Sequence, residues 1–380
     1  MNTPPVSPEA HQARLTRLMA FHAADPTNIG LMQSAAEAAY EAHNYTTCES
    51  LLTSHEALRP LPLALLHLRG LCAMAQRQFD LAAQIFETLL TTQTDATVLY
   101  NLAYTRAMQG RFDEAHVLAD QIATADVPAV VCLKLRVLHH LGRLDDAIAL
   151  GKHEADHPEV RGEVRGLLAS LLLDAGDMDG CRHYAEAAID TPEGRTVSGL
   201  LALDDMQEEV ALEQFRHALA LQPQSGRARL GEGLSLLTMG RFADAVQSLD
   251  QAANLLDVHA GTWVAAGWAH LMNGDMPQAR ERFQQAMAID RGFAEGSGGL
   301  AVVCIHEGKQ EEAEHLAEVA MRLDRNCLSA AYAKSLLLAQ ANEGEAARAM
   351  RDSALEQPIG SNDKTIAQAL ARRSLIRSTL

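Results

Sequence analysis

The chain has few aromatic residues, few cysteines and no long apolar run. Aromatic side chains make up 4% of its 380 residues. No stretch of about 18 apolar residues occurs, so the sequence predicts no membrane insertion. The first thirty residues lack the apolar core of a secretory signal. Six cysteines occur singly without a C-x-x-C pair, which disfavours a disulfide framework. These absences and the many alanines favour a bacterial cytoplasmic protein.

A small residue recurs ten times at a nearly constant spacing. Successive intervals are 34, 33, 32, 34, 30, 34, 34, 34 and 34 residues. A period of this size is typical of stacked helix-turn-helix units, and no segment alternates with the period of two that strands require. The ten positions are Cys48, Ala82, Ala115, Ala147, Cys181, Ala211, Ala245, Ala279, Ala313 and Ala347.

Glycine marks the end of the first helix in six of the units. A left-handed residue at this point lets the chain leave the helix and reverse, and glycine adopts that conformation without strain. Acidic residues follow in the first turn of the second helix, where they complement the helix dipole. The six glycines are Gly110, Gly142, Gly176, Gly240, Gly274 and Gly308.

The eighth unit carries the fullest version of the pattern, with Trp263, Gly267, Gly274, Ala279 and Phe283 in register. This arrangement resembles the tetratricopeptide repeat, W-x2-L-G-x2-Y followed by a Gly-containing turn and A-x3-F-x2-A. The resemblance covers residues 29 to 361. It implies an all-α fold, a right-handed α-solenoid of tandem repeats with terminal capping helices.

The spacing also predicts an organisation into four parts. The interval from Cys181 to Ala211 is 30 residues, about one helical turn shorter than the others. We place the loss at residues 191–194 and expect two subarrays to meet near residues 190–207; a shortened helix that leaves the stacking path unchanged is the alternative. The predicted parts are a disordered start and capping helix (1–28), repeats one to five (29–191), repeats six to ten (192–361) and a basic capping helix (362–380).

Two local motifs suggest chemistry that the repeat register opposes. His153, Glu154 and His157 match the zinc-protease motif H-E-x-x-H, but they fall at the end of a second helix, with no enclosed cleft for a third ligand. A metal-dependent hydrolase is therefore only a remote alternative, and we expect no cofactor or metal. Gly296-Ser297-Gly298-Gly299 resembles a phosphate loop, yet its register places it in a first helix that is either closely packed or locally loosened.

The resemblance implies that partners bind along the first helices, which line the concave wall of such arrays. Asn101 and Arg136 match only part of the carboxylate clamp of chaperone-binding members, so we do not expect that subtype. The wall is rich in aromatic residues, Leu and Met, which are common at interface centres. The predicted partner-binding residues are His67, Leu71, Met74, Tyr100, Asn101, Tyr104, Met108, Arg136, His139, His140, Leu234, Val264 and Trp268.

These features predict a non-enzymatic scaffold or adaptor that binds a helical or extended peptide in its concave groove. A cytoplasmic chaperone for a secreted or assembling client is the alternative. A net charge of −17 disfavours nucleic acid as a partner and favours a protein or peptide with a basic amphipathic face. Self-association through the terminal helices stays open.

Overall fold

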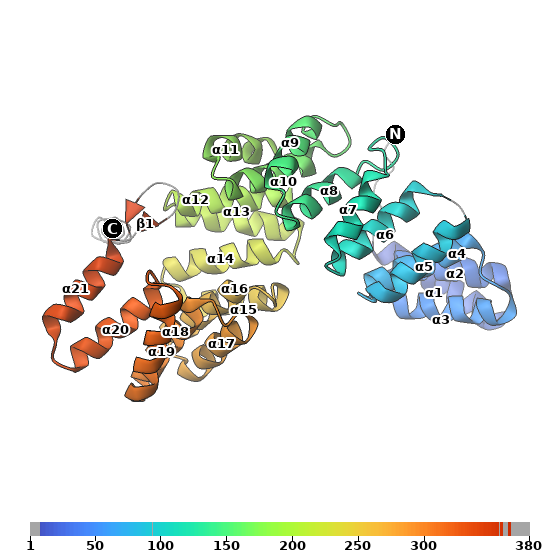
Figure 1. The fold of residues 1–380 in the computed structure, drawn as a ribbon. Helices are drawn as coiled ribbons and strands as arrows, with labels where there is room; N and C mark the ends of the chain where they lie inside the picture. Colours follow the sequence, from blue (N-terminus) through green and yellow to red (C-terminus); the bar gives the residue numbers. More distant parts are fainter. Residues whose placement is uncertain (1–7, 93, 357, 360–363, 366–380) are drawn as a thin grey trace. The chain divides into compact units, whose positions relative to one another are not determined.

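The computed structural model describes residues 8–92, 94–356, 358–359 and 364–365. Within these residues α1 (Pro8–Ala24) is followed by ten pairs of helices (Figure 1). The first helices of the pairs are α2 (Ile29–Glu41), α4 (Leu63–Ala75), α6 (Ala96–Met108), α8 (Val130–His140), α10 (Arg161–Asp174), α12 (Pro192–Asp204), α14 (Gly226–Thr238), α16 (Ala260–Met272), α18 (Ala294–His306) and α20 (Leu328–Gln340). The second helices are α3 (Tyr45–Leu58), α5 (Phe79–Thr92), α7 (Phe112–Asp120), α9 (Leu144–Glu154), α11 (Met178–Ala187), α13 (Glu208–Leu221), α15 (Phe242–Leu255), α17 (Met276–Ile289), α19 (Gln310–Leu323) and α21 (Gly344–Leu355).

The all-α helical-repeat fold predicted from the sequence is thus confirmed. Each of the ten small residues lies on a second helix and is buried. A small side chain is needed there because the two helices of a pair approach closely. The capping helix predicted at the N-terminus is α1, which ends at Ala24, directly before Asp25-Pro26.

Every pair contains the same left-handed turn between its two helices. The six predicted glycines have φ between 71° and 85°. The equivalent turns of the other four pairs use His43, Arg77, Met206 and Asn342, with φ between 55° and 65°. In each turn, the amide of the residue after the left-handed one donates a hydrogen bond to the carbonyl oxygen five residues before it. In the third repeat, for example, Arg111 N donates to Arg106 O at 2.9 Å. This bond pattern closes the helix with or without glycine, which is why the glycine signal missed four turns.

Buried aromatic rings fill the space that glycines leave between helices. Phe215 and Phe283 are fully buried. A Cβ added to Gly231 would lie 2.3 Å from the ring of Phe215, and one added to Gly299 would lie 2.3 Å from that of Phe283. The glycine-rich segment of residues 296–299 lies in α18, as its register predicts, and these contacts require close packing there.

The second helices differ in length along the chain. Six of them, α3, α5, α13, α15, α17 and α19, have 14 residues each, whereas α7, α9 and α11 have 9, 11 and 10. The short interval comes from α11, while α12 has the 13 residues typical of a first helix. Our placement of the loss at the start of α12 is therefore wrong. Thr191 caps α12 by accepting a hydrogen bond from Gly194 N at 3.1 Å.

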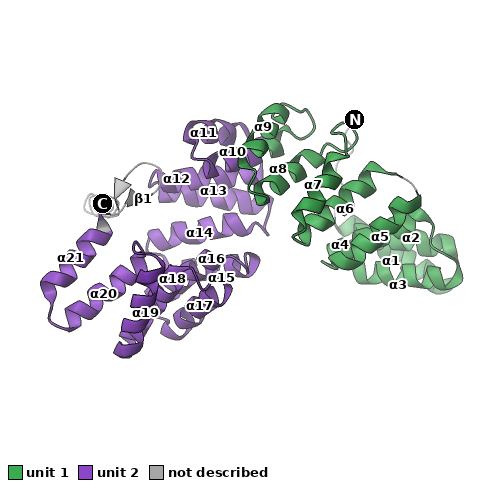
Figure 2. Cartoon of the chain, viewed as in Figure 1, with its two compact units in different colours: residues 1–164 green, residues 165–380 purple. Residues whose placement is uncertain are grey.

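The chain divides into two compact units, residues 1–164 and 165–380, which are coloured separately in Figure 2. This division falls within α10, earlier than residues 190–207. The predicted grouping of repeats one to five and six to ten, with a junction near residues 190–207, stays a prediction.

The two ends of the predicted domain scheme are only partly described. The predicted C-terminal helix at 362–380 is wrong at its start, because Lys364–Thr365 form strand β2, which pairs antiparallel with β1 (Pro358–Ile359). The other residues of that helix, and the disordered start predicted for residues 1–6, lie outside the described residues.

Candidate partner-binding pockets

A pocket of about 460 Å³ lies in the first unit, formed by α2, α4, α5 and α6. We call it the N-terminal pocket. The sequence predicted five of its residues as partner-binding, from the first helices of the second and third repeats. Its lining consists of Tyr40, Leu71, Met74, Ala75, Arg77, Phe79, Tyr100, Tyr104 and Met108.

Two tyrosines one helical turn apart form the aromatic part of the N-terminal pocket. The ring centroids of Tyr100 and Tyr104 are 6.5 Å apart, with 33° between the ring planes. Burial and the neighbouring Tyr104 raise the pKa of Tyr100. Both effects favour the protonated phenol, so the Tyr100 hydroxyl is a hydrogen-bond donor at neutral pH.

Two predicted residues near this pocket serve the fold. The side chain of Asn101 is 7% exposed, and its Nδ2 lies 2.8 Å from Nε2 of His67, one repeat earlier. Burial lowers the pKa of His67, which keeps the imidazole neutral and able to accept from the amide. Asn101 is therefore part of the packing between helices, and its role in partner binding stays a prediction. The hydrogen bond between Asn101 and His67 links α6 to α4.

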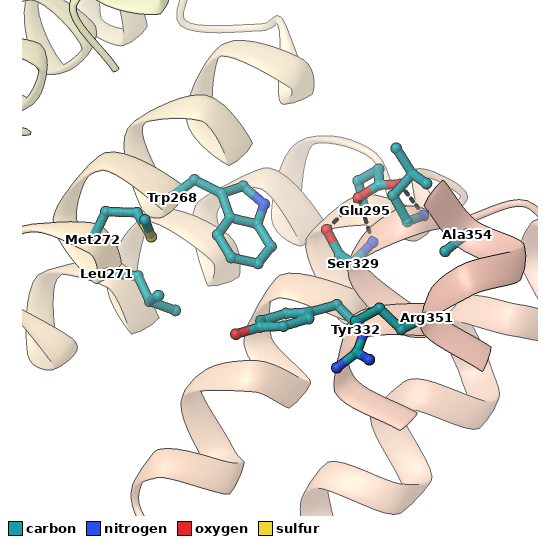
Figure 3. A pocket seen from close by; sticks show the side chains of 9 residues that line it. Trp268, Leu271, Met272, Glu295, Ser329, Tyr332, Arg351 and Ala354 are labelled. Carbon is teal, nitrogen blue, oxygen red and sulfur yellow. Dashed lines mark hydrogen bonds between the residues drawn. The ribbon is translucent and has the colours of Figure 1, made fainter. Parts of the chain in front are cut away.

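A second pocket, of about 490 Å³, lies in the second unit and is formed by α16, α18, α20 and α21. We call it the C-terminal pocket. Trp268 and Tyr332 extend into it from α16 and α20, with ring centroids 6.2 Å apart (Figure 3). Tyr332 is 42% exposed and Met272 is 50% exposed. The full lining is Trp268, Leu271, Met272, Glu295, Leu328, Ser329, Tyr332, Arg351 and Ala354.

The charged residues of the C-terminal pocket have partners within the fold. Glu295 accepts hydrogen bonds from Leu328 N at 2.8 Å, from Ser329 N at 3.2 Å and from Ser329 Oγ (Figure 3). Its carboxylate thereby satisfies the open amides at the start of α20 and complements the positive end of that helix dipole. Nε of Arg351 lies 3.8 Å from Oδ1 of Asp352. The free surface of this pocket is accordingly apolar and aromatic.

The remaining predicted residues do not line either pocket. Val264 is 8% exposed within the core that surrounds Phe283, and its role in partner binding stays a prediction. Leu234 is half-buried on α14, and Arg136 and His139 are exposed on α8. The imidazole of His140 stacks on Phe112, with centroids 4.3 Å apart and 6° between the planes. Burial and then His139 lower the pKa of His140, which favours the neutral ring in this stack.

Some residues that line the pockets were not predicted from the sequence. Tyr332 occupies the position of Val264 two periods later. A valine at that position ends within the core, whereas the longer tyrosine reaches the pocket. Tyr40 and Arg77 were missed as well: Tyr40 belongs to the first repeat, and Arg77 lies in a turn rather than on a first helix.

The zinc-protease motif is not formed as a helix. Helix α9 ends at Glu154, so His153 and His157 do not lie on successive turns of one helix. His153 is exposed, with its Nδ1 3.0 Å from Oε1 of Glu154, and His157 Nδ1 accepts from Glu159 N at 3.4 Å. Across the described residues, no group of three or more His, Cys, Asp or Glu side chains is placed to hold a metal ion.

Two tetratricopeptide repeat profiles match the chain, one at residues 67–129 and 196–257 and the other at residues 270–341. Together the matched segments cover more than half of the sequence. The chain belongs to the tetratricopeptide repeat family. Stacked repeats of this family form extended surfaces that bind other proteins, so the chain is a protein-interaction scaffold.

Solved structures also resemble this tetratricopeptide repeat protein. The crystal structure of the APC/C hetero-tetramer Cut9-Hcn1 matches with 13% identity and a TM-score of 0.47, covering 91% of this chain and 84% of that chain. A crystal structure of MamA matches with 20% identity and a TM-score of 0.34, covering 42% of this chain and 92% of that chain. No curated protein sequence matches. The family assignment stands on the matched segments.

None of the helices in the described part of the chain is long and apolar enough to cross a membrane.

Proposed function

We propose that this protein is a non-enzymatic adaptor that binds an apolar peptide segment, helical or extended, in each of the N-terminal and C-terminal pockets. The observation that carries the proposal is the pair of partly exposed aromatic rings in each pocket, Tyr100 with Tyr104 and Trp268 with Tyr332. Aromatic residues in partly enclosed pockets supply most of the energy of many interfaces. The exposed Met108 and Met272 add flexible apolar surface that adapts to different side chains.

The net charge of −17 supports partners with basic flanks. Attraction of this kind acts over the whole surface and mainly accelerates association, so it weakens as salt screens it. Association rates that do not change between low and high ionic strength would contradict this part of the proposal.

The proposal is tested by comparing partner capture between matched variants of the full chain. One variant carries Tyr100→Ala with Tyr104→Ala, and another carries Trp268→Ala with Tyr332→Ala. Phe21→Ala and Val258→Ala are the controls, because these exposed apolar side chains lie outside both pockets. Circular dichroism first establishes that all variants are equally helical.

A partner that binds both controls should bind the variant of its own pocket more than tenfold more weakly than it binds the wild type. The reason is that loss of a buried aromatic contact costs about 2 kcal/mol. Unchanged affinity in both pocket variants would move the binding surface elsewhere. The same partners separate an adaptor from a chaperone. An adaptor joins two folded proteins at once. A chaperone instead prevents a single captured client from aggregating, which light scattering measures.

A further inference from the structure

Arg77 occupies a backbone position that favours glycine. Its φ is 60°, and the equivalent turn residue is glycine in six of the ten repeats. A non-glycine residue in the left-handed region carries strain. His43, Met206 and Asn342 adopt the same conformation in their turns, so Arg77 differs from them by its place at a pocket and not by its φ. The turn itself needs only the backbone, because the bond from Gln78 N to Ala73 O, 2.8 Å, is the one that closes the glycine turns.

The side chain of Arg77 lies at the N-terminal pocket. Among the nine residues that line this pocket, all of them described, Arg77 is the only one with a charge. It is exposed, and no carboxylate within the described residues forms an ion pair with it.

Three carboxylates on α5 and α7 have other partners. Gln109 donates to Asp80 at 2.7 Å, and Arg106 pairs with Glu87 and, at 3.1 Å, with Glu114.

A second cation lies outside the lining of the N-terminal pocket. Arg136 is exposed on α8 and interacts electrostatically with Tyr100, whose pKa it lowers against the larger effect of burial. Because Arg77 is the only charged residue in its lining, the lining of the N-terminal pocket is positive, whereas the net charge of the whole chain is −17. An arginine that lines the same pocket as tyrosines suits a carboxylate, which can accept two parallel hydrogen bonds from a guanidinium.

We propose that the N-terminal pocket binds an apolar peptide segment that carries an Asp or Glu side chain, and that Arg77 pairs with this carboxylate. The inference rests on the proposed function of the pocket and specifies its partner. The apolar side chains of the segment pack against Met74, Tyr100 and Tyr104, while the acidic side chain reaches the turn between α4 and α5. Basic flanks of the same partner remain compatible with the acidic surface of the rest of the chain.

The probe is a library of random twelve-residue peptides displayed on phage with their C-termini fused, so that side chains supply the only carboxylates. The full chain is used as wild type, as Arg77→Gly, as Arg77→Glu and as the Tyr100→Ala, Tyr104→Ala variant. Asn342→Gly is the matched control, because it makes the same kind of substitution in a left-handed turn of the second unit.

The wild type and Asn342→Gly should enrich peptides that combine apolar residues with Asp or Glu. Arg77→Glu should enrich Lys or Arg in place of the acidic residue. Selected acidic peptides, made with fluorescent labels and amidated C-termini, should bind Arg77→Gly about tenfold more weakly than the wild type.

Two outcomes separate this inference from the proposed function. Peptides that require Tyr100 and Tyr104 but show no acidic preference, or that bind Arg77→Glu unchanged, would overturn the role of Arg77 and leave the pocket as a peptide site. Failure to select any peptide that depends on the two tyrosines would overturn the N-terminal pocket as a binding site.

Discussion

The N-terminal and C-terminal pockets each hold two aromatic rings between 6 and 7 Å apart, yet their charged residues have different partners. In the C-terminal pocket, Glu295 is bonded to the start of α20 and Arg351 lies beside Asp352. In the N-terminal pocket, Arg77 projects from a strained turn, and no described carboxylate pairs with it.

A charged residue at a pocket is thus not by itself a sign of recognition. Glu295 contributes to stability, because its carboxylate satisfies backbone amides that no helical carbonyl reaches. Arg77 contributes no comparable bond and occupies an unfavourable backbone conformation. Removing each residue should therefore change stability in opposite directions, and the predictions below test that contrast.

The largest effect is expected from Gly298→Ala, which acts on the C-terminal pocket alone. The new Cβ would lie 2.7 Å from Ala330 N and 2.7 Å from Ser329 Cβ, so α20 must move away from α18. We expect a loss of about 2 kcal/mol or more, because the clash outweighs the gain of about 1 kcal/mol in helix propensity.

Urea unfolding followed by tryptophan fluorescence measures this loss, since Trp263 and Trp268, the only tryptophans, both lie in the second unit. Gly344→Ala is the control, because no atom lies within 4 Å of its added Cβ. Equal midpoints for the two variants would show that α18 and α20 do not pack as described.

Glu295→Ala should destabilise the second unit by about 1 to 2 kcal/mol, since two backbone amides and the Ser329 hydroxyl lose their acceptor. Tryptophan fluorescence in urea again reports the change, with Glu318→Ala, an exposed residue of α19, as the control. If Glu295→Ala and Glu318→Ala unfold alike, Glu295 is not a structural residue and the contrast with Arg77 fails.

Arg77→Gly should have the opposite sign and stabilise the first unit by roughly 1 kcal/mol, because glycine relieves the strain of the left-handed turn. The greater freedom of glycine in the unfolded chain reduces part of that gain. Slower amide hydrogen exchange in α4 and α5 would measure the effect. Asn342→Gly should gain less, because asparagine tolerates this conformation better; faster exchange in Arg77→Gly would show that the guanidinium supports the fold.

The smallest effect concerns the stability of the fold at low pH. The guanidinium of Arg280, bonded to Glu307 at 2.7 and 3.1 Å, and then Lys309 hold the pKa of Glu307 at about 2, below its ordinary value of 4.5. Since the folded pKa is lower than the unfolded one, the stabilisation is present above about pH 4.5 and is lost as the pH falls toward 2.

Glu307→Gln should therefore cost less than about 1 kcal/mol at neutral pH, because the pair is near the surface. The difference in unfolding free energy between Glu307→Gln and the wild type should shrink as the pH falls from 4.5 to 2. A difference that stays constant over this range would show that the carboxylate charge does not stabilise the second unit.

Particular residues show how far sequence reasoning reached at the two pockets. Five lining residues of the N-terminal pocket were predicted, because large apolar side chains recur on the first helices at fixed register. Of the predicted partner-binding residues, only Trp268 lines the C-terminal pocket. Tyr332 was missed although it lies at the predicted register, and Val264 was predicted although it is buried. Register specifies a direction on the helix, whereas exposure depends on side-chain length and on the neighbouring helices.

The thiols of Cys48 and Cys72 illustrate the same limit. Their positions in the sequence show no pairing, yet the two sulfur atoms lie 3.1 Å apart in the core between α3 and α4. Contacts of this kind depend on how a first helix packs against the preceding second helix.

The repeat, the helix pairs and the places where the chain must reverse follow from the amino-acid sequence, because the period, the small residues and the turn glycines act through local geometry. The packed structure is needed to learn which large side chains are core and which line a pocket, which four turns are left-handed without glycine, and which carboxylates are already bonded. These properties depend on atoms that are brought together from different helices. Local pattern therefore specifies the array, and packing specifies its binding surface.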